Sequence, residues 1–329
     1  MSTLTVLAYE LYYAFFKGFC MRDRGLDHVL YTAVASAVGA GKLLGLDSKK
    51  LSQAVALAVT PNIALHATRR GDLSMWKGVA AGNAARNGVF AALLAQQGMT
   101  GPENAIEGSH GLRELVGSFE LGPLAAPGSD DFKVTQSNLK FFLSEYHSQA
   151  PITIALRLSN DIEPDDIESV TIYTYWFAWS EIGSEPEKWH PTTRESADHS
   201  LPYIISAVLI DRAFSDEIFA EARLSDPRIH ALADKVKVIE DPEFTKRFSR
   251  EIPSRIEIRT RRGELKSAAV DYPRGHFRNP MTDAEVEAKF RALARRSIPS
   301  AQVESALEVL WKIDQARDAG FAFDVLVRT

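Results

Sequence analysis

Lys140 and His147 are the two residues of this chain whose types and spacing best suit acid–base chemistry. They bracket residues 141–146, half of which are aromatic, near the point where the predicted elements change from helices alone to helices and strands. A lysine cation beside a histidine favours the neutral imidazole, which can accept a proton near pH 7. Ligand sites are common where two domains meet. We therefore predict a site that contains Lys140 and His147.

Asp198, His199 and Tyr203 form a second group of side chains able to move protons. The four-residue spacing of His199 and Tyr203 predicts that both lie on one face of a helix. Asp198 is placed to cap that helix or to orient the histidine. A histidine and a tyrosine at this spacing are also typical of a structural contact, so both interpretations stay open on these residues alone.

His28 and Lys77 stand near the starts of two predicted helices. His28 follows Asp27, which is typical either of a helix cap or of a histidine available as acid or base. Lys77 precedes small residues such as Gly78, which leave room for a ligand, although a lone lysine is ordinarily a surface residue. Arg86 falls on roughly the opposite helix face and is predicted to fix packing.

The composition limits the class of protein. The chain has 329 residues, of which 45% are hydrophobic, and a net charge of −5, which gives no support for a nucleic-acid partner. The one cysteine, Cys20, excludes a disulfide, a multi-cysteine zinc site and a cysteine-ligated cluster within one chain. No run suits a membrane span. Residues 4–16 indicate a core helix, not a signal peptide.

The first third of the sequence has the periodicity and caps of helices. Helices are predicted over residues 4–16, 28–44, 48–59 and 75–97. Gly45 ends the second of these, Asp47 or Ser48 caps the third, and Ser74 caps the fourth. The fourth is rich in alanine and glycine, which predicts a tightly packed central helix whose stability comes from tertiary contacts.

The rest of the chain mixes strands with helices. Residues 118–137 indicate a connection, residues 168–175 a strand, and residues 255–260 with 266–272 a β-hairpin. Helices are predicted over residues 151–158, 199–211, 284–295 and 300–318. The expected fold is mostly α, an all-helical domain plus a smaller α+β lid domain. The boundaries expected are 1–137, 138–312 and a return segment, 313–329, that packs on the helical domain.

Several phrases of the sequence recur in one enzyme family when taken together. They are SMWKG…GNAAR (74–86), KFFLSEYHSQ (140–149), ADHSLPY (197–203) and GHFRNPM (275–281). In this order the chain resembles the MmgE/PrpD family. Leu143 stands where that family has a proline, which loosens a turn without removing a functional group. GHFRNPM is predicted to be a loop leading to a helix capped by Thr282 and Glu285, without a catalytic role.

The resemblance implies a lyase that needs neither metal nor cofactor. The implied reaction is the dehydration of 2-methylcitrate, or a related tricarboxylate, to 2-methyl-cis-aconitate in propionate catabolism. The implied setting is a cytoplasmic homodimer that binds neither nucleic acid nor membrane. Two alternatives remain: a cis-aconitate decarboxylase-like lyase, and a truncated, non-catalytic remnant with a scaffold or dimerising role.

The resemblance also assigns roles to the candidate residues. His28, Lys140, His147 and Tyr203 are expected to be catalytic, with Lys140 stabilising charge and the histidines as acid–base candidates. Lys77 and His199 are expected to bind substrate. The family has an N-terminal helical segment that this sequence is expected to lack. A chain without it is expected to self-associate and to be weakly active or inactive.

Overall fold

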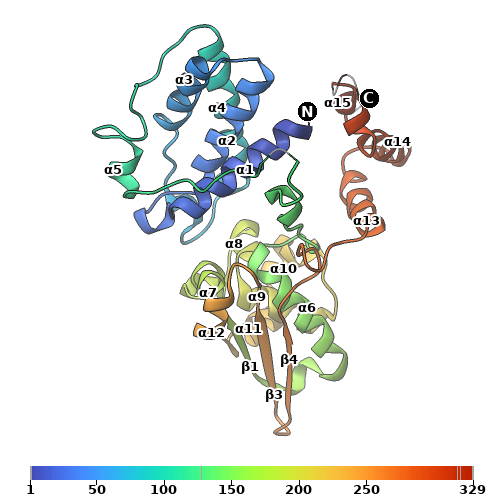
Figure 1. Ribbon diagram of the computed structural model, residues 1–329. Helices are drawn as coiled ribbons and strands as arrows, with labels where there is room; N and C mark the ends of the chain where they lie inside the picture. Colours follow the sequence, from blue (N-terminus) through green and yellow to red (C-terminus); the bar gives the residue numbers. More distant parts are fainter. Residues whose placement is uncertain (1, 127, 317, 319, 328–329) are drawn as a thin grey trace.

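The computed structural model describes residues 2–126, 128–316, 318 and 320–327, and its first part is a bundle of helices (Figure 1). The bundle contains α1 (Ser2–Gly18), α2 (Val29–Leu43), α3 (Ser48–Val59), α4 (Trp76–Gln96) and the short α5 (Leu112–Val116). Helix α2 lies at the centre and packs against α1, α3 and α4. At Gly88 of α4, a Cβ atom would meet the Ala33 carbonyl oxygen of α2 at 2.2 Å, so only glycine permits this close approach.

The residues that cap the helices agree with the prediction at some helix ends and differ at others. Asp47 caps α3 by accepting a hydrogen bond from the Lys50 amide at 2.8 Å, and Gly45 has the positive φ expected after α2. Ser74 does not cap α4, because Met75 occupies the N-cap position and no side chain caps the helix. The predicted helical domain is thus confirmed in its elements and corrected at one cap.

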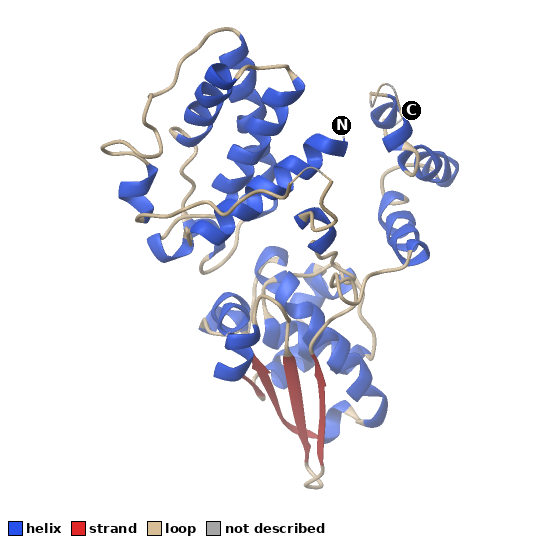
Figure 2. Ribbon diagram, viewed as in Figure 1, coloured by secondary structure: helices blue, strands red, loops and turns tan. Residues whose placement is uncertain are grey.

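A four-stranded sheet organises the second part of the chain (Figure 2). Its strands are β1 (Ile167–Thr174), β2 (Val236–Glu240), β3 (Ser254–Thr260) and β4 (Leu265–Val270), in the order β2-β1-β3-β4. Strand β1 pairs parallel with β2 and antiparallel with β3, which forms the predicted hairpin with β4. The sequence did not predict strand β2, because the strand is short and its apolar and polar residues do not alternate strictly: Val238 and Ile239 are adjacent.

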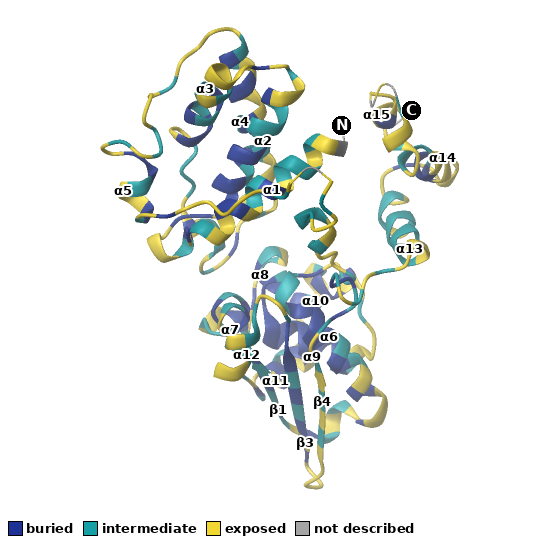
Figure 3. Cartoon of the chain, viewed as in Figure 1, coloured by how far each residue is buried: buried dark blue, intermediate teal, exposed yellow. Residues whose placement is uncertain are grey.

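Helices α6 and α9 cover one face of the sheet and enclose the core of the α+β part. The helices of this part are α6 (Gln149–Leu158), α7 (Trp176–Ile182), α8 (Arg194–Asp198), α9 (Leu201–Asp211), α10 (Glu221–Leu224), α11 (Pro227–Ala233) and α12 (Pro242–Arg247). Nearly all residues of α9 are buried (Figure 3), and so are alternate residues along most of β1 and β3. This burial explains the apolar sequence of α9.

The predicted connection, residues 118–137, runs between the two parts with one short 3₁₀ segment, Lys133–Gln136. The buried carboxylate of Glu10 holds it to α1 by accepting backbone hydrogen bonds from Ala125 at 3.1 Å and Lys133 at 2.5 Å. Pro127, within this connection, lies outside the described residues. The mostly α fold with a smaller α+β part is confirmed, whereas the exact domain boundaries stay a prediction.

The chain ends in α13 (Asp283–Ala294), α14 (Ser300–Leu310) and α15 (Phe321–Asp324). Thr282 and Glu285 form the predicted capping box of α13. The helix predicted over residues 300–318 was too long, since α14 ends at Leu310. The predicted packing of 313–329 on the helical domain stays a prediction, and residues 317, 319, 328 and 329 lie outside the described residues. None of the described helices is long and apolar enough to cross a membrane.

One face of α4 carries an exposed apolar stripe, so the prediction of a tightly packed helix holds for its other face only. Trp76, Val79, Phe90 and Leu93 are all exposed, Phe90 at 59%. We expect the chain to self-associate through this stripe, because large exposed apolar surfaces drive association. Sedimentation velocity over a concentration series is expected to show association that Phe90→Gln weakens and the control Leu265→Gln, on β4, does not. Monomeric wild-type protein at every concentration would contradict this expectation.

Candidate active site

The helical and α+β parts meet along the loop between α3 and α4, which carries the 3₁₀ segment His66–Arg69. The Leu73 amide donates to Ser196 Oγ at 2.9 Å, and Thr193 Oγ1 donates to the Leu73 carbonyl oxygen at 3.3 Å. Both partners belong to the start of α8, whose N-cap is Thr193. This loop therefore fixes the position of the helical part relative to the turn between α8 and α9, where Asp198 and His199 lie.

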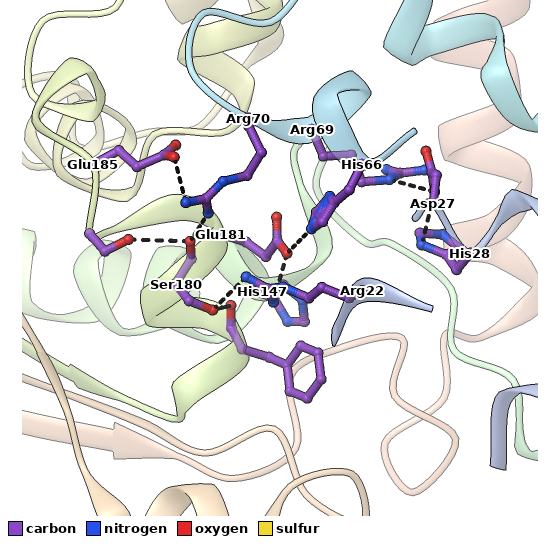
Figure 4. Close-up of polar contacts among 12 residues, drawn as sticks. Arg22, Asp27, His28, His66, Arg69, Arg70, His147, Ser180, Glu181 and Glu185 are labelled. Carbon is purple, nitrogen blue, oxygen red and sulfur yellow. Dashed lines mark hydrogen bonds and ion pairs between the residues drawn. The ribbon is translucent and has the colours of Figure 1, made fainter. Parts of the chain in front are cut away.

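A second set of contacts between the two parts is ionic (Figure 4). Arg22 of the helical part pairs with Glu181 of α7 at 2.7 Å and donates to Ser180 Oγ at 3.0 Å. Glu181 also lies 3.8 Å from Nε2 of the buried His66, and burial lowers the pKa of that histidine. These mostly buried charges fix the contact more firmly than surface pairs would.

His28 is held at this boundary by a buried carboxylate (Figure 4). Its Nδ1 atom lies 3.3 Å from Oδ1 of Asp27, which also accepts from Arg69 Nε at 3.0 Å. Desolvation and the Arg69 charge outweigh Asp27 and lower the pKa of His28 to about 4. A neutral His28 that donates Nδ1–H toward Asp27 keeps its Nε2 lone pair available as an acceptor.

His199 is the most buried of the predicted histidines, with 10% of its side chain exposed. Its Nδ1 lies 3.1 Å from the Glu195 carbonyl oxygen, which can only accept, so Nδ1 carries the hydrogen and Nε2 carries the lone pair. Burial, opposed by Glu145 and assisted by Lys77, lowers the pKa of His199 to about 3. The ring is therefore neutral at pH 7, and its Nε2 is free of a proton and able to accept one.

Lys77 and Lys140 bring positive charge to the same place. Both ammonium groups interact electrostatically with Glu145, Asp198 and His199. Neither forms an ion pair with a carboxylate of the described residues. Burial lowers the pKa of Lys77, against the pull of Glu145 and Asp198. The ammonium groups of Lys77 and Lys140 are therefore available to a ligand, close to the neutral imidazole of His199.

Glu145 joins Lys140 to His147. Burial disfavours the Glu145 carboxylate, but His147, His199 and Lys140 outweigh burial and hold its pKa below the usual range. His147 Nε2 lies 3.9 Å from Glu145, and its Nδ1 contacts the hydroxyl of the buried Tyr175. Burial raises the pKa of Tyr175 well above its usual value, so the phenol stays protonated and donates a hydrogen bond to Nδ1. His147 Nε2 then carries hydrogen and faces Glu145.

The structure does not bring Tyr203 to these residues. Tyr203 lies in the fully buried core of the α+β part, and its hydroxyl donates to the Ile218 carbonyl oxygen at 2.6 Å. The predicted shared helix face of His199 and Tyr203 is wrong, because α9 begins at Leu201 and Ser200 is its N-cap. His199 instead ends α8. The geometry gives no support to the catalytic role expected for Tyr203.

Sequence reasoning found five of the converging residues, His28, Lys77, Lys140, His147 and His199, and missed others. The residues it missed are Arg69, Glu145 and Lys188. Glu145 stood inside the phrase that drew attention to His147 and was passed over. Arg69 and Lys188 each end a short 3₁₀ segment, His66–Arg69 and Pro186–Lys188, that has no spacing signal in the sequence, so only the tertiary fold places them here.

The described cavities of about 540 and 440 Å³ lie elsewhere, one beside α14 and one between the end of α3 and α5. None of the predicted site residues lines either of them. Among the residues that the structure describes, no group of three or more His, Cys, Asp or Glu side chains is arranged to hold a metal ion. The candidate site is therefore identified by its side-chain chemistry.

Comparison with known proteins shows where this chain has relatives. Residues 2–120 match the MmgE/PrpD N-terminal domain, and residues 142–315 match the MmgE/PrpD C-terminal domain. The 2-methylcitrate dehydratase of Escherichia coli K12 is 29% identical over 89% of this chain and 62% of its own length. The mitochondrial 2-methylcitrate dehydratase of Yarrowia lipolytica is 30% identical over 86% of this chain and 56% of its own.

A relative with another activity also matches. Human cis-aconitate decarboxylase is 24% identical over 87% of this chain and 59% of its own length. The chain thus spans about three fifths of the length of these three relatives. Their names describe a dehydratase and a decarboxylase, and both names refer to reactions of tricarboxylates.

Proposed function

Because the chain belongs to the MmgE/PrpD family, we propose that it contributes the active site of a lyase that dehydrates 2-methylcitrate or a related tricarboxylate. The observation that carries the proposal is that Lys77 and Lys140, which have no ion pair with a described carboxylate, both lie within electrostatic reach of a neutral His199 whose Nε2 carries the lone pair. Cations suit the substrate carboxylates, and a neutral base suits the acidic C–H beside a carboxylate.

The proposed steps use groups already held in place. Lys140 and Arg69 bind carboxylates, and His199 Nε2 takes the proton from the carbon next to a carboxylate. The C–O bond to the neighbouring hydroxyl then breaks, and the hydroxyl leaves as water with a proton from Lys77. The burial that lowers the pKa of Lys77 makes its ammonium a stronger acid for that transfer. A double bond remains between the two carbons.

His28 and His147 keep the acid–base roles predicted for them as part of the proposal. His28, oriented by Asp27, is the second neutral imidazole at the boundary and accepts the proton if the substrate binds in the opposite sense. His147 fixes Glu145, whose charge balances Lys77 and Lys140 in the absence of substrate. The cytoplasmic setting, the homodimer and a place in propionate catabolism likewise remain proposals.

We expect the active protein to dehydrate 2-methylcitrate with no added metal. The measurement is the absorbance of the conjugated alkene product with a chelator present, on this chain and on a version extended to the length of its relatives. Turnover that appears only when iron or zinc is restored would contradict the proposal. Failure of both versions with 2-methylcitrate and citrate would favour a non-catalytic role.

A second candidate reaction is the decarboxylation of cis-aconitate, favoured by the match to the human decarboxylase. The same cations would bind the substrate, and the Lys77 ammonium group would supply the proton that replaces the lost carboxylate. Assays of both substrates separate the two reactions, because one releases water and keeps every carboxylate while the other releases carbon dioxide. We expect release of carbon dioxide to be absent or far slower.

A further inference from the structure

The phrase GHFRNPM, for which the sequence suggested no catalytic role, lies directly against the backbone of Lys140. The Gly275 carbonyl oxygen accepts a hydrogen bond from the Leu139 amide at 2.8 Å. In return, the Phe277 amide donates to Oδ1 of Asn138 at 2.9 Å. The two residues that precede Lys140 are therefore each hydrogen-bonded to the same short loop.

The loop itself is rigid. The Gly275 amide donates to the Asn279 carbonyl oxygen at 2.9 Å, and the Asn279 amide donates to the His276 carbonyl oxygen at 2.7 Å. Arg274 pairs with both oxygens of Glu285, and it also donates to the Asn279 side chain at 3.0 Å. Glu285 belongs to the capping box of α13, so the loop is anchored to the first turn of a helix.

The same helix reaches Lys140 a second time. Lys289, further along α13, donates from its ammonium group to the Lys140 carbonyl oxygen. On the following side, the Gln149 side chain of α6 accepts from the Phe142 amide at 2.9 Å and donates to its carbonyl oxygen at 3.2 Å. The backbone is thus held before, at and after Lys140, although the residue itself is exposed and lies outside any helix or strand.

Gly275 is the position where this contact is tightest. Its φ of +91° belongs to the region that disfavours other residues. A Cβ atom there would lie 2.1 Å from the Leu139 carbonyl oxygen and 3.1 Å from the Leu139 carbonyl carbon. The clash is with backbone, so a side chain at position 275 must push the chain that carries Lys140 away from the loop.

We propose that residues 274–282 act as a clip that positions Lys140, and that this clip, acting through Lys140, sets the affinity of the site for a substrate carboxylate. The second half of the statement rests on the function proposed above. Gly275 and Asn138 are positioning residues, since neither is expected to touch the substrate. A lysine on a flexible segment would lose both side-chain and backbone conformational entropy when it binds a carboxylate. Because the clip already fixes the backbone, only the side-chain entropy is lost on binding.

The test compares two glycines of the α+β part that share a positive φ. Gly275→Ala strains the backbone and collides with Leu139. The control, Gly263→Ala, has a φ of +85° with nothing within 4 Å of the added Cβ, so it carries similar strain at a hairpin turn without touching the clip. Asn138→Ala, at an exposed position, removes only the hydrogen bond to Phe277 and serves if Gly275→Ala fails to fold.

Two readouts apply to the full chain. Amide hydrogen exchange at Leu139 is expected to accelerate about tenfold or more in Gly275→Ala or Asn138→Ala, which is the size expected for loss of a hydrogen bond, and to stay unchanged in Gly263→Ala. The Kd for citrate, measured by calorimetry, is expected to rise about tenfold in the same two variants. In a Lys140→Ala background the clip variants are expected to add little, because they act through Lys140.

Two results would overturn the clip. One is an unchanged rate of amide exchange at Leu139 in a folded Gly275→Ala protein. The other is that the clip variants raise the Kd for citrate as much in the Lys140→Ala background as in the wild-type background. Failure of the proposed function has a different signature. If wild-type protein dehydrates no tricarboxylate while Leu139 exchange accelerates as expected, the lyase proposal falls and the positioning of Lys140 stands.

Discussion

Lys140→Ala is expected to lower kcat/KM for 2-methylcitrate by about 10²–10⁴-fold, the usual cost of removing one oriented charge partner from a reacting centre. The Lys140 side chain is exposed and has no ion pair with a described carboxylate. Its removal is therefore expected to change the free energy of unfolding by less than about 0.5 kcal/mol. Steady-state kinetics and urea unfolding of the same preparation separate the two effects.

The control for Lys140→Ala is Lys266→Ala. Lys266 lies in β4, and its ammonium group is 3.7 Å from the carboxylate of Glu264. The hairpin of β3 and β4 lies far from the helical part in Figure 1. We expect Lys266→Ala to retain wild-type kcat/KM. A Lys140→Ala enzyme with wild-type turnover, or one whose loss of activity matches its loss of stability, would make Lys140 a surface lysine and remove it from the site.

His199→Asn is expected to lower kcat by about 10²–10⁴-fold with a much smaller change in KM, because it removes the proposed base and leaves Lys140 and Arg69 to bind the substrate carboxylates. His110→Asn is the matched control, since 94% of the His110 side chain is exposed and asparagine tolerates its positive φ. Equal losses in both variants, or a rise in KM alone for His199→Asn, would contradict the assignment of His199 as base.

The pH dependence follows from the same histidine. Burial lowers the pKa of His199 to about 3 in the folded chain, whereas an unfolded histidine titrates near about 6.5. The unfolded state then binds more protons between these values, so this contribution to stability is present above about pH 6.5 and is lost as the pH falls toward 3. Unfolding free energies measured from pH 7 to 4 are expected to fall less steeply in His199→Asn than in wild type.

The kinetic counterpart of this shift is the acid limb of kcat/KM, which reports ionisation in the free enzyme. With a neutral His199 and a neutral His28, whose pKa is lowered to about 4, the limb is expected well below pH 6.5. The kcat limb is expected at higher pH, because a bound tricarboxylate anion stabilises the imidazolium. A kcat/KM limb at or above pH 6.5 would show that neither histidine is the base.

The helical part could be predicted from local signals, and the α+β part only in outline. The caps Asp47 and Thr282 and the hairpin turn at Gly263 are recognisable because each depends on residues close in sequence. Strand β2 pairs with β1 from more than sixty residues away, and five residues carry too weak an alternation to reveal it. The predicted start of α9 at His199 was wrong, because the N-cap is Ser200 and not Asp198. Ser200 has the extended backbone, and its side chain accepts the capping hydrogen bond from the Tyr203 amide.

The site shows the same division between local and tertiary information. Family phrases pointed to Lys77, Lys140, His147 and His199, and the fold brings these together with His28. Tyr203 belonged to the same phrase as His199, yet its place in a buried helix directs its hydroxyl to Ile218. Membership of a phrase therefore does not separate residues that build the scaffold from residues that face the substrate. Arg69 and Glu145 reach the site through a loop and a turn whose positions depend on long-range packing.

The central claim, that a tricarboxylate binds where the helical and α+β parts meet, is tested most directly by a crystal structure of this chain with citrate. We expect one citrate carboxylate within hydrogen-bond distance of Lys140 Nζ, another beside the Arg69 guanidinium, the citrate hydroxyl near Lys77 Nζ, and a citrate carbon facing His199 Nε2. Citrate ordered at another place, or no citrate at this boundary at a concentration that saturates binding in solution, would contradict it.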